Sequence, residues 1–393
     1  MSQDVFILSA ARTPIGSFLG SLSTLPAHAL GAVAIKSAVE RAEVPAARVE
    51  HVWMGNVLQA GQGQAPARQA LLGAGLPKST GAVTLHKVCG SGMRAVMDAA
   101  NALRCGEFEI VVAGGMESMS NAPYLLPKGR LGHRMGHGQL LDSMISDGLW
   151  DPYKNVHMGN CAELCAAKYA FTREAQDAYA LESYQRARRA NESGDFNAEF
   201  APVTIEGKKG ATVVDRDEEP FATPLEKLEK MGSLKPAFQQ EGTVTAANAS
   251  KINDGASALV LAGEKAAAGA KPIARILSQA SFAQEPEWFT TAPIAAAKKA
   301  AERAGIPLAS IDLFEVNEAF AVVALAFVKD LDVDPNKVNV NGGAVALGHP
   351  IGASGARIIT TLVHALKARK RKYGLASICI GGGEATAVVV EAL

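Results

Sequence analysis

Two short motifs, Cys89-Gly90-Ser91-Gly92-Met93-Arg94 and Gly352-Ala353-Ser354-Gly355-Ala356-Arg357, decide the fold of this 393-residue chain. Each motif is followed by an alanine-rich segment and then by an apolar stretch, which ends in Gly114-Gly115-Met116-Glu117 in the first case and in Gly381-Gly382-Gly383-Glu384 in the second. The separation from Arg94 to Gly114 is 20 residues, and that from Arg357 to Gly381 is 24. This shared order of motif, helix, strand and glycine turn indicates a duplicated unit.

The rest of the chain alternates between two kinds of pattern. Continuous apolar stretches, which are typical of buried strands, lie at residues 5–8, 110–113, 258–261, 311–316, 376–380 and 387–390. Stretches with helical spacing lie at residues 91–104, 172–193, 292–304 and 355–369. Alternating strands and helices predict an α/β fold, and strands that are apolar throughout predict a sheet covered on both faces.

One long segment, residues 119–243, departs from this alternation. It contains seven prolines, many charges and few long apolar runs, so we expect a partly helical loop domain inserted into the first half. We therefore expect an N-terminal half at residues 1–118, completed by about residues 244–268, and a C-terminal half at residues 269–393. Within the insertion, the acidic run at residues 215–219 is most simply a solvated turn.

The charge balance and hydropathy exclude several classes of protein. Lys plus Arg and Asp plus Glu number 39 each, whereas a protein that neutralises nucleic-acid phosphates usually has a basic excess. A composition of 48% hydrophobic and 20% charged residues is that of a folded chain. No apolar run reaches the ~18–20 residues that cross a bilayer, and the N-terminal stretch predicts a first strand rather than a secretory signal. We expect neither a nucleic-acid nor a membrane partner.

The five cysteines, Cys89, Cys105, Cys161, Cys165 and Cys379, are sparse and odd in number, which excludes a disulfide framework. Cys161 and Cys165 are one helical turn apart, but no second ligand pair lies near them in the sequence. We expect two buried thiols there and no metal site. The pattern fits a reducing cytoplasm.

Two residues in or near the glycine-rich motifs are candidate catalytic residues. Cys89 follows an expected strand at residues 83–88 and opens a helix, where the positive end of the helix dipole favours a thiolate; alternatively it is a small cysteine packed at the turn. His349 lies in a glycine-rich loop ahead of a helix, as a general base does, although a lone histidine is often structural.

Two further candidates stand at the ends of apolar strands, where sites of α/β proteins assemble. Cys379 precedes the triglycine of residues 381–383, whose unhindered N–H groups suit an oxyanion or a phosphate. The lysine and spacing of a P-loop are absent, and no GxGxxG follows the first strand, which argues against nucleotide hydrolysis and NAD binding. Asn317 ends another strand, where its amide can donate to a carbonyl, hold a water or cap a helix.

Taken together, these motifs resemble those of the thiolase family. The stretches that match the family in order are HKVCGSGMRAV at residues 86–96, HMGNCAE at 157–163, NASKINDGASA at 248–258, NEAF at 317–320, GGAVALGHPIGASGAR at 342–357 and CIGGGEA at 379–385. The resemblance covers essentially the whole chain. It is greatest to the biosynthetic branch that makes acetoacetyl-CoA, because His157-Met158-Gly159 is present.

The resemblance implies a duplicated, five-layered αβαβα fold with an inserted loop domain, assembled as a homotetramer that is a dimer of dimers. It implies that Cys89 is the nucleophile that becomes acetylated, that His349 activates it, and that Cys379 takes a proton from the methyl group of a second acetyl-CoA. Asn317, through a water, and His349 would form one oxyanion site. The N–H groups of Cys89 and Gly381 would form the other.

The resemblance also implies the substrate contacts. Ser250 would touch the pantetheine of coenzyme A, and Leu149, His157, Met158, Ala319 and Phe320 would line the tunnel and the acyl pocket. Two departures from the family are visible. Pro220-Phe221-Ala222 stands where relatives often carry a basic residue near the adenine, so no adenine partner is assigned. Trp288-Phe289 replaces smaller residues and is expected to reshape the acyl pocket.

The expected reaction is the reversible condensation of two acetyl-CoA to acetoacetyl-CoA and CoA, without metal or other cofactor, because the CoA thioesters are substrates. The alternatives are a degradative 3-ketoacyl-CoA thiolase of broader chain length and a non-catalytic CoA-binding scaffold. A decarboxylating ketoacyl synthase would carry histidine in place of Cys379.

Overall fold

The two halves of the chain build sheets with the same strand order. A computed structural model describes residues 3–208 and 210–393. In the N-terminal half the order is β4 (Gly81–Leu85), β3 (His51–Gly55), β5 (Ile110–Ser118), β12 (Asn253–Gly263) and β1 (Val5–Arg12). In the C-terminal half it is β14 (Leu313–Val316), β15 (Tyr373–Ile380), β16 (Glu384–Ala392) and β13 (Ala274–Ala283).

The pattern of parallel and antiparallel pairs is also repeated. In the N-terminal half β4, β3 and β5 run parallel, and β12 and β1 are added antiparallel. In the C-terminal half β14 and β15 run parallel, β16 and β13 are antiparallel, and a parallel bridge from Phe314 to Val338 stands where β4 stands in the first half. Antiparallel pairing of β1 with β13 joins the halves into one ten-stranded sheet, which includes the short β2 (Gly16–Ser17) beside β12. The predicted duplication is confirmed.

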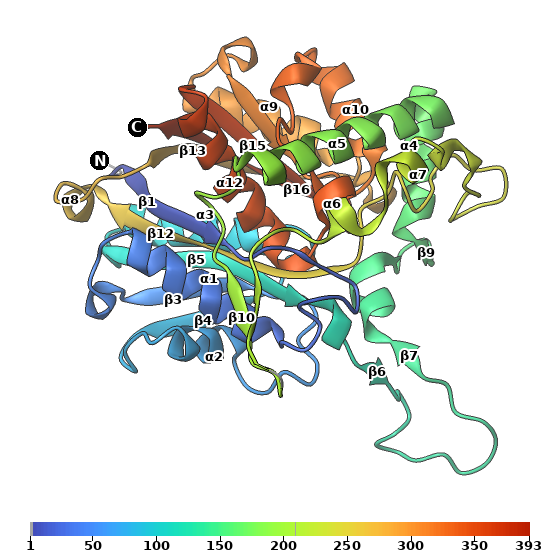
Figure 1. Cartoon of the computed structure of the whole chain (residues 1–393), viewed down its shortest axis with the longest axis horizontal. Coiled ribbons are helices and arrows are strands. Elements are labelled where there is room, and N and C mark those ends of the chain that lie inside the picture. Colours follow the sequence, from blue (N-terminus) through green and yellow to red (C-terminus); the bar gives the residue numbers. More distant parts are fainter. Residues whose placement is uncertain (1–2, 209) are drawn as a thin grey trace.

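Helices form three layers around these strands (Figure 1). The helices α1 (Ala27–Arg41) and α2 (Pro66–Gly73) pack on the N-terminal strands, and α9 (Ala292–Ala304), joined by α10 (Ala321–Leu331), packs on the C-terminal strands. Between them, α3 (Ser91–Arg104) and α12 (Ile351–Ala368) contact each other and strands of both halves. The arrangement is the five-layered αβαβα fold that was expected.

Close packing of backbones holds the central helices against the sheet. Every residue of β5 and β12 is buried. A side-chain carbon at Gly115 of β5 would overlap the carbonyl of Gly352 in the first turn of α12. Glycine therefore lets the start of α12 lie directly on β5, three residues beyond His349.

Most predicted elements have the expected bounds. The predicted helices at 91–104 and 292–304 are α3 and α9, and the helix at 172–193 is α5 (Arg173–Ser193), with Thr172 as its N-cap. The expected strand at 83–88 is wrong, because β4 ends at Leu85. The chain turns tightly there, with hydrogen bonds from Gly90 N to Lys87 O (3.0 Å) and from Ser91 N to Val88 O (3.1 Å).

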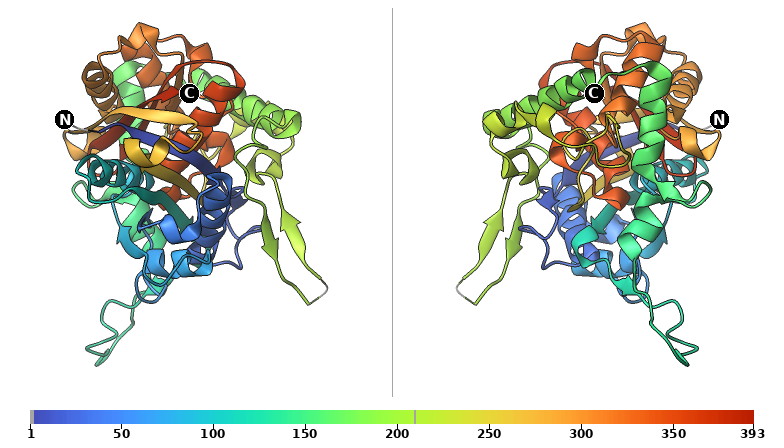
Figure 2. Two further views of the ribbon diagram at one scale, coloured as in Figure 1. Left: turned by 90° about the vertical axis from the view of Figure 1, so that its left-hand side faces the viewer. Right: turned by 90° about the vertical axis from the view of Figure 1, so that its right-hand side faces the viewer.

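The segment 119–243 contributes short elements around the sheet. They are β6 (Tyr124–Leu125), β7 (Leu141–Asp142), β8 (Trp150–Asp151), β9 (Val156–His157), α4 (Met158–Tyr169), α5, β10 (Val203–Ile205), β11 (Thr212–Val214), α6 (Glu219–Ala222) and α7 (Leu225–Leu228). The loop between β6 and β7 extends far from the body of the molecule (Figure 1), and the β10–β11 hairpin projects from another side (Figure 2).

The expectation that residues 215–219 form a solvated turn is wrong for Asp217, which is fully buried. Asp217 accepts hydrogen bonds from Arg12 Nη1 (2.7 Å) and from the backbone N–H of Ile15 (2.9 Å), while Arg12 Nε also donates to Glu199 Oε1 (2.6 Å). The guanidinium lies over the rings of Phe196 and Phe200. A buried charge is retained only when it is paired in this way, so Asp217 ties the insertion to β1.

The cysteines are free thiols, and Cys161 and Cys165 are buried on α4 as expected. Within residues 3–208 and 210–393, no group of three or more His, Cys, Asp or Glu side chains is arranged to hold a metal ion. Among the helices described, none combines the length and apolar character needed to cross a bilayer.

Candidate active site

Three of the predicted catalytic residues, Cys89, His349 and Gly381, line a cavity of about 560 Å³ whose walls are mostly apolar, whereas Asn317 and Cys379 lie outside its lining. It lies between the two halves and is covered by the insertion. The lining residues that were predicted as site residues are Cys89, Leu149, His157, Met158, Ser250, Ala319, Phe320, His349 and Gly381.

Cys89 reaches the cavity from the tight turn between β4 and α3. Val88, directly before it, has a φ of 46°, a left-handed conformation that is strained for a β-branched residue. Ser91 holds this turn, since its Oγ accepts from Lys87 N (2.8 Å) and donates to Val88 O (2.6 Å). Lys87 also pairs with Glu384 of the C-terminal half (2.5 Å). The strain persists because these contacts fix the turn.

The Cys89 sulfur faces two backbone N–H groups, its own and that of Gly381. Burial nevertheless raises the pKa of the Cys89 thiol to about 11, and these N–H groups lower it only in part. The expectation that the helix start favours a thiolate is therefore wrong. Desolvation exceeds the effect of these N–H groups, so Cys89 is a neutral thiol, and the nucleophilic role predicted for it requires a base that takes its proton.

His349 is the residue predicted to act as a base, and it lines the same cavity. Its backbone N–H donates to Asn253 Oδ1 (2.9 Å), and its Nδ1 lies 2.6 Å from Ser354 Oγ. Because Ser354 Oγ donates its proton to Pro350 O (3.0 Å), it accepts from Nδ1–H, and this hydrogen-bond network assigns the free lone pair to Nε2. Burial, with a smaller contribution from the charge of Arg357, lowers the pKa of His349 to about 3, so the imidazole is neutral.

Asn317 lies beside this imidazole. Its Nδ2 is 3.4 Å from His349 Nε2, and its Oδ1 is buried without a hydrogen-bond partner in the described structure. An unpaired buried amide oxygen is costly unless a ligand or water meets it. Asn317 Oδ1 can therefore accept a hydrogen bond from a water molecule, whose second O–H is free to donate to an oxygen atom of a substrate.

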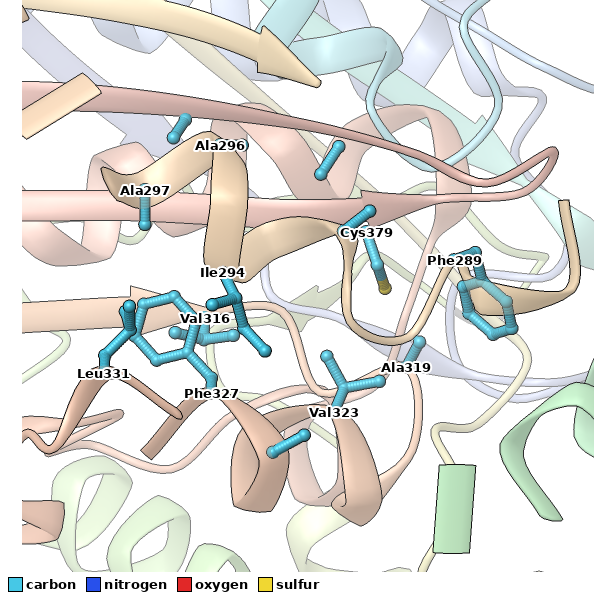
Figure 3. Close-up of a cluster of buried hydrophobic side chains, with 14 of the residues drawn as sticks. Phe289, Ile294, Ala296, Ala297, Val316, Ala319, Val323, Phe327, Leu331 and Cys379 are labelled. Carbon is cyan, nitrogen blue, oxygen red and sulfur yellow. The ribbon is translucent and has the colours of Figure 1, made fainter. Parts of the chain in front are cut away.

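Cys379 lies beneath the cavity at the end of β15, fully buried among the residues of a hydrophobic cluster. Figure 3 shows its sulfur directed toward Phe289 and Ala319. The N–H of Ala319 faces this sulfur, and burial together with nearby Cys89 raises the pKa of Cys379 well above its usual range. The fold thus brings both thiols, from opposite halves, to the same place.

The predicted substrate residues line the cavity with distinct geometry. His157 caps α4 by accepting from Gly159 N (3.1 Å), stacks on Phe238 (4.7 Å between ring centroids) and has its pKa lowered by burial. Phe289 also lines the cavity and meets the ring of Phe320 edge-on. Trp288, expected to act with Phe289, instead lies under the ammonium of Lys168.

Several residues at the site were not predicted from the sequence. Ser354 belongs to the repeated motif, in which it aligns with Ser91. Because Ser91 holds the Cys89 turn, this alignment could have indicated that Ser354 holds the His349 side chain. Lys251 and Glu219 line the cavity. Lys251 directly follows Ser250, which was predicted to touch the substrate, and this position could have indicated that Lys251 lies at the site. Phe238, which covers His157, carries no local signal in the sequence.

Buried Glu117 joins the two halves next to the site. Its carboxylate accepts from Val57 N (2.9 Å), Asn56 Nδ2 (2.7 Å) and Gly352 N (3.0 Å). Burial raises the pKa of Glu117 to about 7 against the opposing effect of these donors. The contact to Gly352 fixes the first turn of α12, which follows the loop that carries His349.

Comparisons with known proteins agree with this geometry. Residues 5–265 match the thiolase N-terminal domain and residues 270–392 the thiolase C-terminal domain. Acetyl-CoA acetyltransferase 2 of Arabidopsis thaliana is 54% identical over 100% of this chain and 98% of its own length, and acetyl-CoA acetyltransferase of Cupriavidus necator is 52% identical over 99% of each. The crystal structure of Acat5 thiolase from Ascaris suum in complex with coenzyme A has a TM-score of 0.93 and 48% identity over the full length of both chains.

Proposed function

The chain belongs to the thiolase family, and on this premise we propose that it is an acetyl-CoA C-acetyltransferase, which joins two acetyl-CoA into acetoacetyl-CoA and CoA. One observation carries the proposal. The Cys89 thiol and a neutral imidazole, which come from the two halves of the chain, line a largely apolar cavity, and the buried Cys379 thiol lies close enough to Cys89 to feel its charge. The names of full-length relatives at about half identity support the same reaction.

In the first half-reaction, Cys89 Sγ attacks the thioester carbonyl and passes its proton to His349 Nε2. The N–H groups of Cys89 and Gly381 stabilise the oxyanion, and loss of one such donor typically costs ~3–4 kcal/mol. The departing CoA thiolate takes the proton of Cys379. The products are acetyl-Cys89, free CoA, a Cys379 thiolate and an imidazolium, whose opposite charges compensate each other inside the site.

In the second half-reaction, the Cys379 thiolate removes a proton from the methyl group of another acetyl-CoA. The imidazolium of His349, together with Asn317 acting through a water, stabilises the enolate oxygen. The enolate carbon then attacks acetyl-Cys89, the carbon–sulfur bond breaks, and Cys89 regains its proton from His349. Every residue returns to its initial state. The same steps in reverse order carry out thiolysis of acetoacetyl-CoA.

Mass spectrometry of the intact protein after incubation with acetyl-CoA tests this proposal. We expect one acetyl group on the wild-type chain, located at Cys89 by peptide mapping, and none on Cys89→Ala, which should also lose all turnover. A wild-type protein that binds CoA but never acquires the adduct would instead be the non-catalytic scaffold.

The second candidate, a degradative thiolase of broader chain length, uses the same residues. Phe289 and Phe320 meet edge-on at the cavity wall, which favours a short acyl group. Comparison of kcat/KM for acetoacetyl-CoA and for longer 3-ketoacyl-CoA substrates separates the two functions. A strong preference for the longer chains would contradict our proposal.

We also propose that the protein works as a homotetramer in the cytoplasm. The arm between β6 and β7 exposes large apolar side chains away from the body of the molecule, which is typical of an interaction surface. The free cysteines suit a reducing compartment. Because some relatives are mitochondrial, the location is tested by immunoblotting of cell fractions.

A further inference from the structure

The segment of residues 248–253, which contains Ser250, is tied to both loops that carry catalytic residues. Its backbone exchanges hydrogen bonds with the loop after Asn317, from Ser250 N to Ala319 O and from Ala321 N to Asn248 O (both 2.9 Å). Asn253, at the other end, accepts from the backbone N–H of His349.

Between these two ties, Lys251 places its ammonium against backbone carbonyls. Lys251 Nζ donates to Ala249 O (2.7 Å) and to Val345 O (3.3 Å), and it lies 5.6 Å from the centre of the Tyr184 ring. The side chain lines the substrate cavity. It therefore links the segment expected to touch pantetheine with α11 (Ala344–Leu347), the single helical turn directly before His349.

Val345 is held by charged groups at both of its backbone polar atoms. Its N–H donates to Glu318 Oε2 (3.1 Å), and its carbonyl accepts from Lys251. Glu318 is itself fixed by Tyr179 Oη and Ser183 Oγ (both 2.8 Å). Gly342 and Gly348, on either side of the turn, have positive φ values, which glycine adopts without strain, so the contacts of Val345 fix a short turn between two glycines.

The ammonium lies between two carbonyl oxygens, those of Ala249 and Val345, and donates a hydrogen bond to each. Burial lowers the pKa of Lys251 to about 8, while the charges of Glu219 and Glu318 raise it, so the cation predominates at neutral pH. Without it, two carbonyl dipoles would face a poorly solvated space, which is unfavourable.

We propose that Lys251 is a positioning residue whose ammonium joins the Ala249 carbonyl to the Val345 carbonyl and so aligns the CoA-binding segment with the loop that carries His349. This inference rests on the proposed function and adds to it a residue that acts through the backbone, without touching the reacting atoms.

Three variants test the role of the charge. Lys251→Ala removes the ammonium and leaves space, Lys251→Met fills the space without charge, and Lys265→Ala removes an ammonium that is 90% exposed. We expect KM for the CoA thioester to rise roughly ten-fold in both Lys251 variants, with a smaller fall in kcat, and no change in Lys265→Ala. An unchanged KM in both Lys251 variants would overturn the proposal.

Chemical rescue distinguishes a cation from a spacer. Added ethylammonium should lower KM of Lys251→Ala toward the wild-type value and leave Lys251→Met unchanged, because methionine occupies the space. Tetramethylammonium, which cannot donate a hydrogen bond, is the control for ionic strength. Equal effects of the two salts would contradict a cation held by carbonyl groups.

A readout independent of catalysis separates this inference from the proposed function. If the space binds the amine, ethylammonium should raise the Tm of Lys251→Ala in a concentration-dependent way, but not that of wild type or Lys251→Met. A Tm shift in a protein that never forms acetyl-Cys89 would refute the proposed function and leave the cation role standing. Normal thiolase activity with no Tm shift and no change of KM would refute only the role of Lys251.

Discussion

At the scale of the residue, the reactivity of Cys89 is set by two opposing effects. The positive end of a helix favours an anion by about 0.3–1 kcal/mol, whereas moving a charged group from water into a protein interior costs several kcal/mol. The second effect dominates, and burial raises the pKa of Cys89. The sequence shows which residue starts the helix, but it does not show how deeply the sulfur is buried, so the thiol state could not be predicted from it.

Cys379→Ala should separate the two half-reactions. The variant retains Cys89, His349 and the two N–H donors at the Cys89 sulfur, so some acetyl-Cys89 should still form. Condensation should fall by at least about a hundred-fold, because no group remains to take the methyl proton. Acetyl-adduct mass and acetoacetyl-CoA production report the two steps, and condensation at the normal rate would show that another base acts.

Ser354→Ala should impair the base without affecting binding. Loss of the 2.6 Å contact at Nδ1 removes the acceptor that selects the tautomer of His349. We expect kcat to fall roughly ten-fold with little change in KM. Steady-state kinetics measures the split between the two constants, and Ser233→Ala, at an exposed serine that ends the short 3-10 helix Met231–Ser233 of the insertion, is the control.

His349 should make the protein less stable in acid. Its pKa in the folded state, about 3, lies below that of the unfolded chain, near 6.5, so the unfolded state binds more protons between these values. Stability is therefore lost progressively as the pH falls through 6.5 toward 3. Relative to His349→Gln, the wild type should lose about 2 kcal/mol between pH 7 and pH 5, as measured by chemical denaturation. Equal pH dependence of the two proteins would contradict the neutral buried imidazole.

At the scale of the element, helix bounds follow from local signals where caps are present. The helical spacing of residues 292–304 predicts α9 with both of its bounds, and Gly305 ends the helix in the left-handed conformation after Ala304. The start of α12 at Ile351 was missed by four residues, although Pro350 directly before it is a good start signal. The end of β4 was missed for another reason: the left-handed Val88 is imposed by contacts to Ser91 and to the distant Glu384 loop, which no local pattern reveals.

Gly115→Ala should damage the site from a distance. An added methyl group would overlap the carbonyl of Gly352 and push α12, with the His349 loop, away from β5. We expect a loss of about 1–3 kcal/mol in stability and a large fall in kcat. Gly232→Ala, where an added Cβ meets nothing within 4 Å, is the matched control for thermal unfolding and kinetics. A Gly115→Ala protein with wild-type kcat would show that this close approach does not position His349.

At the scale of the whole molecule, the duplication was readable in the sequence because both copies keep the same glycine positions. The way in which the copies meet was not readable. The pairing of β1 with β13, the ion pair of Lys87 with Glu384 and the contact of Glu117 with Gly352 join residues that are more than 200 positions apart. The predicted catalytic residues stand in recognisable motifs, whereas Lys251 and Phe238, whose places depend on tertiary contacts, do not.

The arm between β6 and β7 should control assembly. Leu131 and Met135 are 93% and 87% exposed, and burial of both in an interface would stabilise it by roughly 1.5–3 kcal/mol each. The double variant Leu131→Ser, Met135→Ser should therefore lower the molar mass measured by light scattering, with Tyr153→Ser as an exposed control on another loop. An unchanged mass would show that the arm does not hold the proposed tetramer together.

The division of the site between the two halves has a consequence for the symmetry of the molecule. Cys89 comes from one half and Cys379 from the other, so neither half alone carries both predicted thiols. In the aligned motifs, Gly352 stands opposite Cys89 and Val112 opposite Cys379. The molecule therefore has pseudo-symmetry in its backbone but not in its thiols, and the place related to the site by that pseudo-symmetry carries neither sulfur.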